Sequence, residues 1–329
     1  MISSTPIWQL TDAVVSKVTG SPLISYDFAV GRTPFSTLSS VTAALVTYYL
    51  VIFGGREIMK HREPFKLRTW TKIHNVALTG VSGLLLALTV EQLLPQLWSQ
   101  GLTYNICGHG GWTAPLEVLY LLNYLTKYIE FVDTVLLMLK KKPLTFLHTY
   151  HHGATAFLCY AQLLGATPVS WVPITINLFV HCLMYNYFYL TSCGRKVWYK
   201  RYITMIQIVQ FVIDLGFIYW VSYNFFATQY FEDSAPLMQN QCAANTREIV
   251  GAMTEDKVRK HEFAAFTGLV CLTSYLFLFI AFYFATYKKP ASNKICGAGQ
   301  SNALRVKAHV EPMVAEITQK VMSVARPLA

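Results

Sequence analysis

The sequence contains little charge. Only 13% of its 329 residues are Asp, Glu, Lys or Arg, whereas 53% are hydrophobic. Soluble proteins carry about 25% charged residues, so this deficit indicates a membrane protein. The net charge of +10 would suit a nucleic-acid-binding protein. Because the basic residues lie between long apolar runs, we expect no nucleic acid and relate them to membrane orientation and to an anionic ligand.

Other features are also missing from the sequence. Residues 1–20 lack a continuous apolar run, so we expect no cleaved signal peptide. The seven cysteines lack the spacing of a metal site, and most fall within apolar runs. There is no internal repeat. These absences argue against a cysteine-ligated metal module and against a repeat architecture.

Long apolar runs dominate the chain. A helix that crosses a bilayer needs about 20 mostly apolar residues. Seven segments qualify: 34–53, 73–97, 116–139, 144–164, 172–192, 202–225 and 264–287. The sequence predicts an all-α polytopic membrane protein in which seven transmembrane helices form one bundle over residues 34–287. A segment of residues 1–33 precedes the bundle, and a tail of residues 288–329 follows it.

Lysine and arginine are concentrated in alternate loops. Residues 54–72, 140–143 and 193–201 and the start of the tail are basic, whereas loop 227–263 carries six acidic against four basic residues. Short basic loops stay on the cytosolic side. We therefore expect the N-terminus in the lumen or outside the cell and the C-terminus in the cytosol.

Three histidines begin the fourth predicted span. His148, His151 and His152 stand at positions i, i+3 and i+4 and therefore share a helix face. A single histidine there would more often be a core residue with a hydrogen-bond partner. Three on one face, just inside the membrane, favour metal ligation, acid–base catalysis or a nucleophile.

Polar residues also interrupt three other spans. The third carries Lys127, Glu130, Asp133 and Thr134, which could be a buried pair for helix packing or a group that orients the histidines. The fifth carries Asn177, His181, Met184 and Tyr185 on one face. In the sixth, Thr204, Gln207, Gln210 and Asp214 recur every three or four residues, which interhelical hydrogen bonding alone could explain.

Together these patterns resemble the ELO family of very-long-chain fatty acid elongases. The chain matches the family's HxxHH box, its KxxExxDT and TxxQxxQ motifs, and NxxVHxxMYxYY over residues 177–187. Phe188 departs from this last motif, where the family usually has a second tyrosine. Residues 141–160 are most similar to fungal-type elongases of saturated and monounsaturated chains.

The resemblance implies a very-long-chain 3-oxoacyl-CoA synthase. Such an enzyme condenses a long-chain acyl-CoA with malonyl-CoA to 3-ketoacyl-CoA and releases carbon dioxide and CoA. The resemblance implies an acyl-imidazole intermediate on His151 and a tunnel for the acyl chain, closed at its lumenal end. From this tunnel and the local resemblance we expect saturated or monounsaturated chains of about 14 carbons or more.

Further roles follow from the same mapping. His148, His152 and His181 would position the reacting groups and transfer protons. The supporting residues are Lys127, Glu130, Asp133, Asn177, Tyr185 and Gln207. For the anionic CoA we expect basic residues of two cytosolic loops, although membrane topology alone could account for their charge. They are Lys140, Lys141, Lys142, Arg195, Lys196, Lys200 and Arg201.

The resemblance also implies location and partners. We expect the endoplasmic reticulum membrane, no cofactor and no metal, with acyl-CoA, malonyl-CoA and membrane lipid as ligands. The ketoacyl-CoA reductase, dehydratase and enoyl-CoA reductase of the elongation cycle are the expected protein partners. The sequence leaves the oligomeric state open, a homodimer included.

Two other classes compete with this interpretation. A di-iron desaturase needs about eight clustered histidines, but His61 and His74 flank a loop and His109 and His261 are expected in lumenal loops. His309 falls in the tail. A seven-span receptor or transporter would not explain histidines clustered beside a buried Lys-Glu-Asp set.

Topology singles out two cysteines. Cys107 and Cys242 are the cysteines expected in lumenal loops, where disulfides form, whereas the cytosol keeps thiols reduced. The sequence predicts a bridge between them; the alternative is two free thiols.

Overall fold

The computed structural model describes residues 5–231 and 240–287. The part of the chain that it describes is helical and contains no strand. The α-helices are α1 (Pro6–Thr19), α2 (Leu38–Met59), α3 (Arg68–Cys107), α4 (Ala114–Leu139), α5 (Phe146–Gly165), α6 (Trp171–Ser192), α7 (Lys200–Tyr230), α8 (Gln241–Gly251) and α9 (Glu255–Tyr287). Short 3-10 turns occur at Leu23–Ser25 (η1), His109–Gly111 (η2) and Pro168–Ser170 (η3). The predicted tail of residues 288–329 lies outside the described residues.

Five helices are long and apolar enough to cross a membrane: α2, α3, α6 together with η3, α7 and α9. The chain is therefore a polytopic all-α membrane protein. Helices α4 and α5 occupy the other two predicted spans but do not have that apolar character, since α4 carries Lys127, Glu130 and Asp133 and α5 carries three histidines. That α4 and α5 also cross the membrane remains a prediction.

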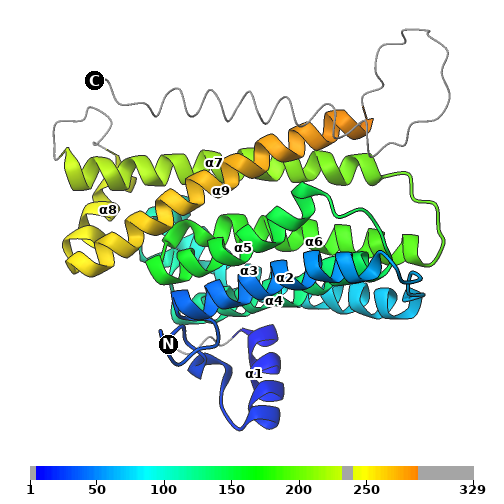
Figure 1. The fold of residues 1–329 in the computed structure, drawn as a ribbon. Helices are drawn as coiled ribbons and strands as arrows, with labels where there is room; N and C mark the ends of the chain where they lie inside the picture. The colour runs from blue at the N-terminus through cyan, green and yellow to red at the C-terminus, as the bar shows by residue number, and fades with distance from the viewer. Residues whose placement is uncertain (1–4, 232–239, 288–329) are drawn as a thin grey trace, which may run out of the picture.

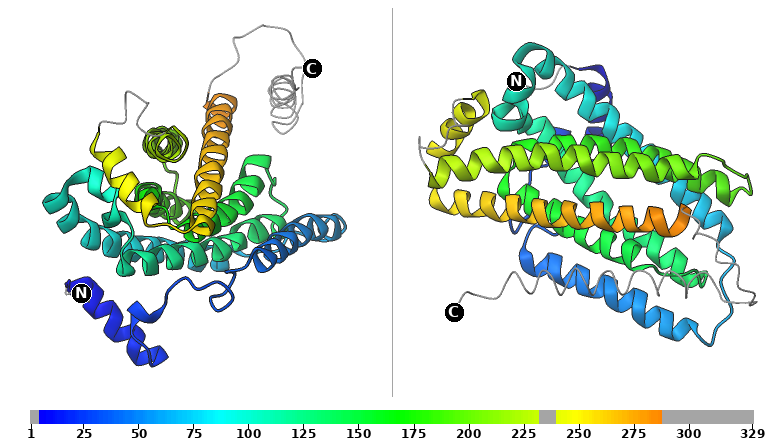
Figure 2. Two further views of the ribbon diagram at one scale, coloured as in Figure 1. Left: turned by 90° about the vertical axis from the view of Figure 1, so that its left-hand side faces the viewer. Right: turned by 90° about the horizontal axis from the view of Figure 1, so that it is seen from above.

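The long helices lie side by side in one bundle (Figures 1 and 2). Direct packing links α3 to α4, α4 to α5, α5 to α9, α9 to α7, α7 to α6 and α6 back to α3. These six helices form a closed ring, and α2 packs outside it against α4 and α5. The residues that line the central space therefore come from helices far apart in the sequence.

Helix α3 is longer than the predicted span 73–97. It continues to Cys107 across a kink at Gly101, whose φ of 79° suits a residue without a Cβ. The extension brings Cys107 to Cys242 at the start of α8. The structure bonds their sulfur atoms, with the Cα atoms 5.2 Å apart, which is the pairing predicted from topology.

Helix α1 lies within the predicted segment 1–33 and runs across the bundle axis (Figures 1 and 2). The Glu91 carboxylate of α3 accepts hydrogen bonds from the backbone N–H groups of Ile7 and Trp8, at 2.7 and 2.9 Å. The Trp8 side chain is buried. These contacts attach the N-terminal segment to the bundle.

Candidate active site

The motif of α4 forms a buried ion pair that reaches α6. Lys127 Nζ donates to Glu130 Oε1 at 2.9 Å and to Asn177 Oδ1 at 3.2 Å. His181 Nδ1 lies 3.3 Å from the same glutamate oxygen. Lys127, Glu130 and His181 are each at most 5% exposed. The intrahelical pair thus also joins two helices, which fits both the packing and the functional interpretation.

The histidine box lies in the first turns of α5. The Thr145 hydroxyl caps this helix by accepting a hydrogen bond from the His148 backbone N–H at 3.3 Å. The His152 ring lies 4.5 Å from the His148 ring and 5.7 Å from the His151 ring, between centroids. The predicted convergence of the three histidines is therefore present in the structure.

Each histidine of the box has a different environment. His148 Nε2 lies 3.0 Å from Thr134 Oγ1, which in turn contacts the Tyr48 hydroxyl at 3.1 Å. His152 is buried, and its Nδ1 has no hydrogen-bond partner among the described residues. The His151 ring packs 4.9 Å from the Tyr275 ring of α9. Of the three, His151 lines the central cavity.

Asp133 is bonded on both carboxylate oxygens. His74 Nε2 lies 2.8 Å from Oδ1, and the Tyr185 hydroxyl donates to Oδ2 at 2.8 Å. Tyr185 is fully buried, and its ring lies 5.4 Å from the ring of His181. This chain of contacts connects α3, α4 and α6 beside the site.

Sequence reasoning missed two of these residues. His74 was expected beside a loop, at the start of the predicted span 73–97, and it does lie on α3, but its contact with Asp133 was not predicted. Tyr48 of α2 was not considered, yet it bonds to Thr134. A polar side chain inside an apolar run was the available signal for both. His261 was expected in a loop but lies in α9, where its ring bonds to the Gly165 carbonyl at 2.9 Å.

Gln207 contacts helix α6 rather than the cavity. Its amide nitrogen lies 3.7 Å from the Met184 sulfur, and it does not line the central cavity. Gln210 and Asp214, further along α7, do line it. Of the polar residues predicted along α7, Gln207 thus packs against α6, whereas Gln210 and Asp214 belong to the cavity wall.

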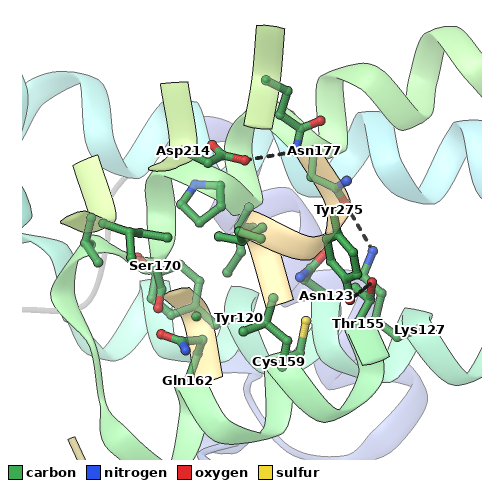
Figure 3. A pocket seen from close by; sticks show the side chains of 18 of the residues that line it. Tyr120, Asn123, Lys127, Thr155, Cys159, Gln162, Ser170, Asn177, Asp214 and Tyr275 are labelled. Carbon is green, nitrogen blue, oxygen red and sulfur yellow. Dashed lines mark hydrogen bonds between the residues drawn. The ribbon is translucent and has the colours of Figure 1, made fainter. Parts of the chain in front are cut away.

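A cavity lies between helices α4, α5, α6, α7 and α9 (Figure 3). His151, Lys127 and Asn177 belong to its wall. Apolar residues of α5, α6, α7 and α9 form much of the rest, and the wall continues to Trp112 and Ser170 beside η2 and η3. The cavity therefore joins the histidine box to the end of the bundle that carries the disulfide.

The predicted CoA-binding lysines and arginines border the loops after α4 and α6, at the end where the histidine box begins. Lys141, Lys142, Arg195, Lys196, Lys200 and Arg201 are exposed. Lys140 Nζ is half-buried and donates to Thr71 at 2.7 Å, and partial burial together with Lys142 lowers its pKa. Arg201 donates to the Tyr283 hydroxyl at 2.7 Å. Residues 140–142 and 195–201 thus present positive charge at one end of the bundle.

Metal ligation was one of the alternatives raised by the histidine box. Over residues 5–231 and 240–287, no group of three or more His, Cys, Asp or Glu side chains is arranged to hold a metal ion. The His152 ring makes a tilted contact with His148 and an edge contact with His151, and the neighbours of the box include Thr134 and Tyr275.

The fold and the site define a helical membrane protein in which His151 lines a cavity between the helices. Residues 33–295 match the ELO (GNS1/SUR4) family, and the chain belongs to this family. It is 44% identical over 288 residues to putative fatty acid elongase 1 of Schizosaccharomyces pombe, covering 88% of this chain and 81% of that relative. Putative fatty acid elongase 2 of the same organism is 40% identical, over 88% of this chain and 74% of the relative. Fatty acid elongase A of Dictyostelium discoideum is 33% identical, over 80% and 88%.

Proposed function

We propose that this protein elongates fatty acids by condensing a long-chain acyl-CoA with malonyl-CoA. The products are 3-ketoacyl-CoA, carbon dioxide and free CoA, as expected for a 3-oxoacyl-CoA synthase. The observation that carries the proposal is the position of His151, which lines a cavity between the helices together with the buried Lys127. Membership of a family whose relatives are named fatty acid elongases supports the same activity.

His151 is the proposed nucleophile. Its imidazole attacks the thioester carbonyl, and CoA leaves as a thiol after taking a proton, which gives an acyl-imidazole. Malonyl-CoA then loses carbon dioxide, and the resulting enolate attacks the acyl carbon. The carbon–carbon bond forms as the carbon–nitrogen bond to His151 breaks, and the departing imidazole nitrogen takes up a proton from solvent, which regenerates neutral His151.

Lys127 and Asn177 are placed to support this chemistry. Both line the cavity with His151, and Glu130 fixes the lysine. A cation held in a dry cavity stabilises negative charge on a developing oxyanion or enolate. His148, His152 and His181 would orient the groups and move protons, with Asp133 and Tyr185 holding this arrangement.

The cavity is the proposed acyl-chain tunnel. In this proposal all seven long helices cross the endoplasmic reticulum membrane, with the N-terminus lumenal and the basic loops cytosolic. The CoA phosphates then meet residues 140–142 and 195–201, and the chain extends toward Trp112. The reaction needs no cofactor, and the reductases and dehydratase of the cycle would act on its product.

A turnover assay tests the proposal. Purified protein is incubated with malonyl-CoA and a ladder of saturated and monounsaturated acyl-CoAs, and the products are read by mass spectrometry. We expect 3-ketoacyl-CoAs two carbons longer from chains of about 14 carbons or more. Absence of any extended product from a folded protein would contradict the proposal, and a strong preference for polyunsaturated chains would overturn the substrate assignment.

A further inference from the structure

Two buried oxygen atoms in the cavity wall lack a partner. They are Oδ1 of Asn123 on α4 and Oδ1 of Asp214 on α7, neither of which has a hydrogen-bond partner among the described residues. Both residues line the cavity and are at most 2% exposed. Figure 3 shows the two side chains on different sides of the pocket. An unpaired buried acceptor destabilises a protein unless a bound molecule satisfies it.

Other polar side chains in the same wall are satisfied. Tyr120 donates to the Gly111 carbonyl, and Thr155 contacts the Tyr275 hydroxyl. Gln162 donates to the Ala264 carbonyl and accepts from Thr167. The unpaired oxygens are therefore not a general property of this cavity.

Asp214 is the more versatile of the two groups. The amide oxygen of Asn123 only accepts hydrogen bonds, whereas the carboxyl group of Asp214 can accept or donate one. Its other oxygen, Oδ2, already accepts from Gln210 Nε2 at 3.2 Å, which orients the group. The remaining oxygen is positioned to accept one donor from the contents of the cavity.

The place of Asp214 along the cavity indicates which part of a substrate it meets. The Phe211 ring lies 5.7 Å from the Tyr275 ring, which itself lies 4.9 Å from His151. Asp214 follows Phe211 by three residues, about 4.5 Å further along α7. It therefore faces the body of an acyl chain rather than the carbonyl carbon.

We propose that Asp214 forms a subsite for a hydroxyl group carried by the acyl chain. This rests on the proposed function, because it takes the cavity as the acyl-chain site. The hydroxyl donates to Asp214 Oδ1 and so pairs the one carboxyl oxygen that the protein leaves unpaired. An unsubstituted alkyl chain has no donor at this depth.

The test uses acyl-CoAs of one length, each with a single hydroxyl at successive carbons, and the unsubstituted chain. With full-length protein and malonyl-CoA, we expect kcat/KM to peak at one hydroxyl position, about tenfold or more above the other hydroxylated chains. Asp214→Leu should remove the peak, and Asp214→Asn, which keeps an acceptor oxygen, should retain part of it. Ser222→Ala, on α7 but outside this cavity, serves as the control and should keep the peak.

A flat wild-type profile, or a peak that Asp214→Leu leaves unchanged, would overturn the subsite while condensation itself stands. If the wild-type protein forms no extended product from any of these acyl-CoAs, the proposed function is overturned instead. A binding measurement then decides the subsite separately: free hydroxylated and unsubstituted fatty acids are compared by their effect on the thermal midpoint of the detergent-solubilised protein. We expect the larger shift from one hydroxylated isomer and its loss in Asp214→Leu. Equal shifts from all chains would overturn the subsite.

Discussion

The side chains of the candidate site lie partly on single helices and partly on helices distant in the sequence. The spacing of His148, His151 and His152 predicted a shared face, and that of Lys127 and Glu130 predicted an intrahelical pair; both are present. The contact between His74 and Asp133 joins residues 59 positions apart. The spacing of residues along one helix does not specify which helices will be neighbours. The structure was therefore needed to identify His74 as the partner of Asp133.

His151→Ala should abolish condensation. The substitution removes the proposed nucleophile, and loss of a covalent catalyst typically lowers kcat by about 1,000-fold or more. Initial rates with malonyl-CoA and a saturated acyl-CoA measure the effect. His109→Ala, at an exposed histidine outside the cavity, is the control. Near-normal turnover by a folded His151→Ala protein would remove His151 from this role.

His74→Ala should lower kcat by about tenfold. The substitution leaves Asp133 Oδ1 without its partner. An unsatisfied, partly buried acceptor costs about 1–3 kcal/mol. Asp133 would then hold the Tyr185 hydroxyl, beside His181, less firmly. His74→Asn, which retains a donor, should recover part of the loss. If the alanine and asparagine variants both match the wild type in kcat, the contact has no part in positioning Tyr185.

At the scale of elements, the hydropathy of the sequence predicted where the long helices lie, but it predicted their first and last residues less accurately. Helices α4, α5 and α6 fall within a few residues of the predicted segments, whereas α3 continues past its segment to Cys107. Helices α1 and α8 were not predicted, because their apolar residues are too few for a span and their stability comes from contacts with the bundle. One such contact joins Glu91 of α3 to the backbone N–H groups at the start of α1.

The close approach of α5 and α9 depends on Gly165. A Cβ at this position would stand 2.4 Å from the Ala264 Cβ and 2.8 Å from the Lys260 carbonyl oxygen. Gly165→Ala should therefore destabilise the protein by about 1–3 kcal/mol through overpacking. The thermal midpoint in detergent measures this loss. Gly216→Ala is the matched control, since no atom lies within 4 Å of a Cβ there. An equal midpoint for the two variants would show that α5 and α9 can separate without cost.

At the scale of the whole molecule, the sequence predicted an all-α membrane bundle but not its order. The ring α3–α4–α5–α9–α7–α6 is completed by packing between segments distant in the sequence, α5 with α9, α9 with α7 and α6 with α3, and the cavity lies inside it. The disulfide was predictable because the sequence places both cysteines in loops expected on the lumenal side, where disulfides form. The count of seven spans remains a prediction for α4 and α5.

Removing the disulfide should destabilise the fold. Cys107 and Cys242 are separated by 135 residues, for which the chain-entropy model gives about 4–5 kcal/mol. Cys242→Ser should therefore lower the thermal midpoint, while Cys193→Ser, at a free cysteine at the opposite end of the bundle, should not. Peptide mapping without reductant checks the bond itself. Alkylation of both residues in that experiment would refute the bridge.

The acyl-imidazole on His151 is the central claim, and intact-protein mass spectrometry tests it most directly. Protein incubated with acyl-CoA alone should release one equivalent of CoA and gain the mass of the acyl group, with the modified peptide containing His151. Added malonyl-CoA should discharge the adduct to 3-ketoacyl-CoA. CoA release that requires malonyl-CoA, with no adduct in its absence, would contradict the account and favour direct attack within a ternary complex.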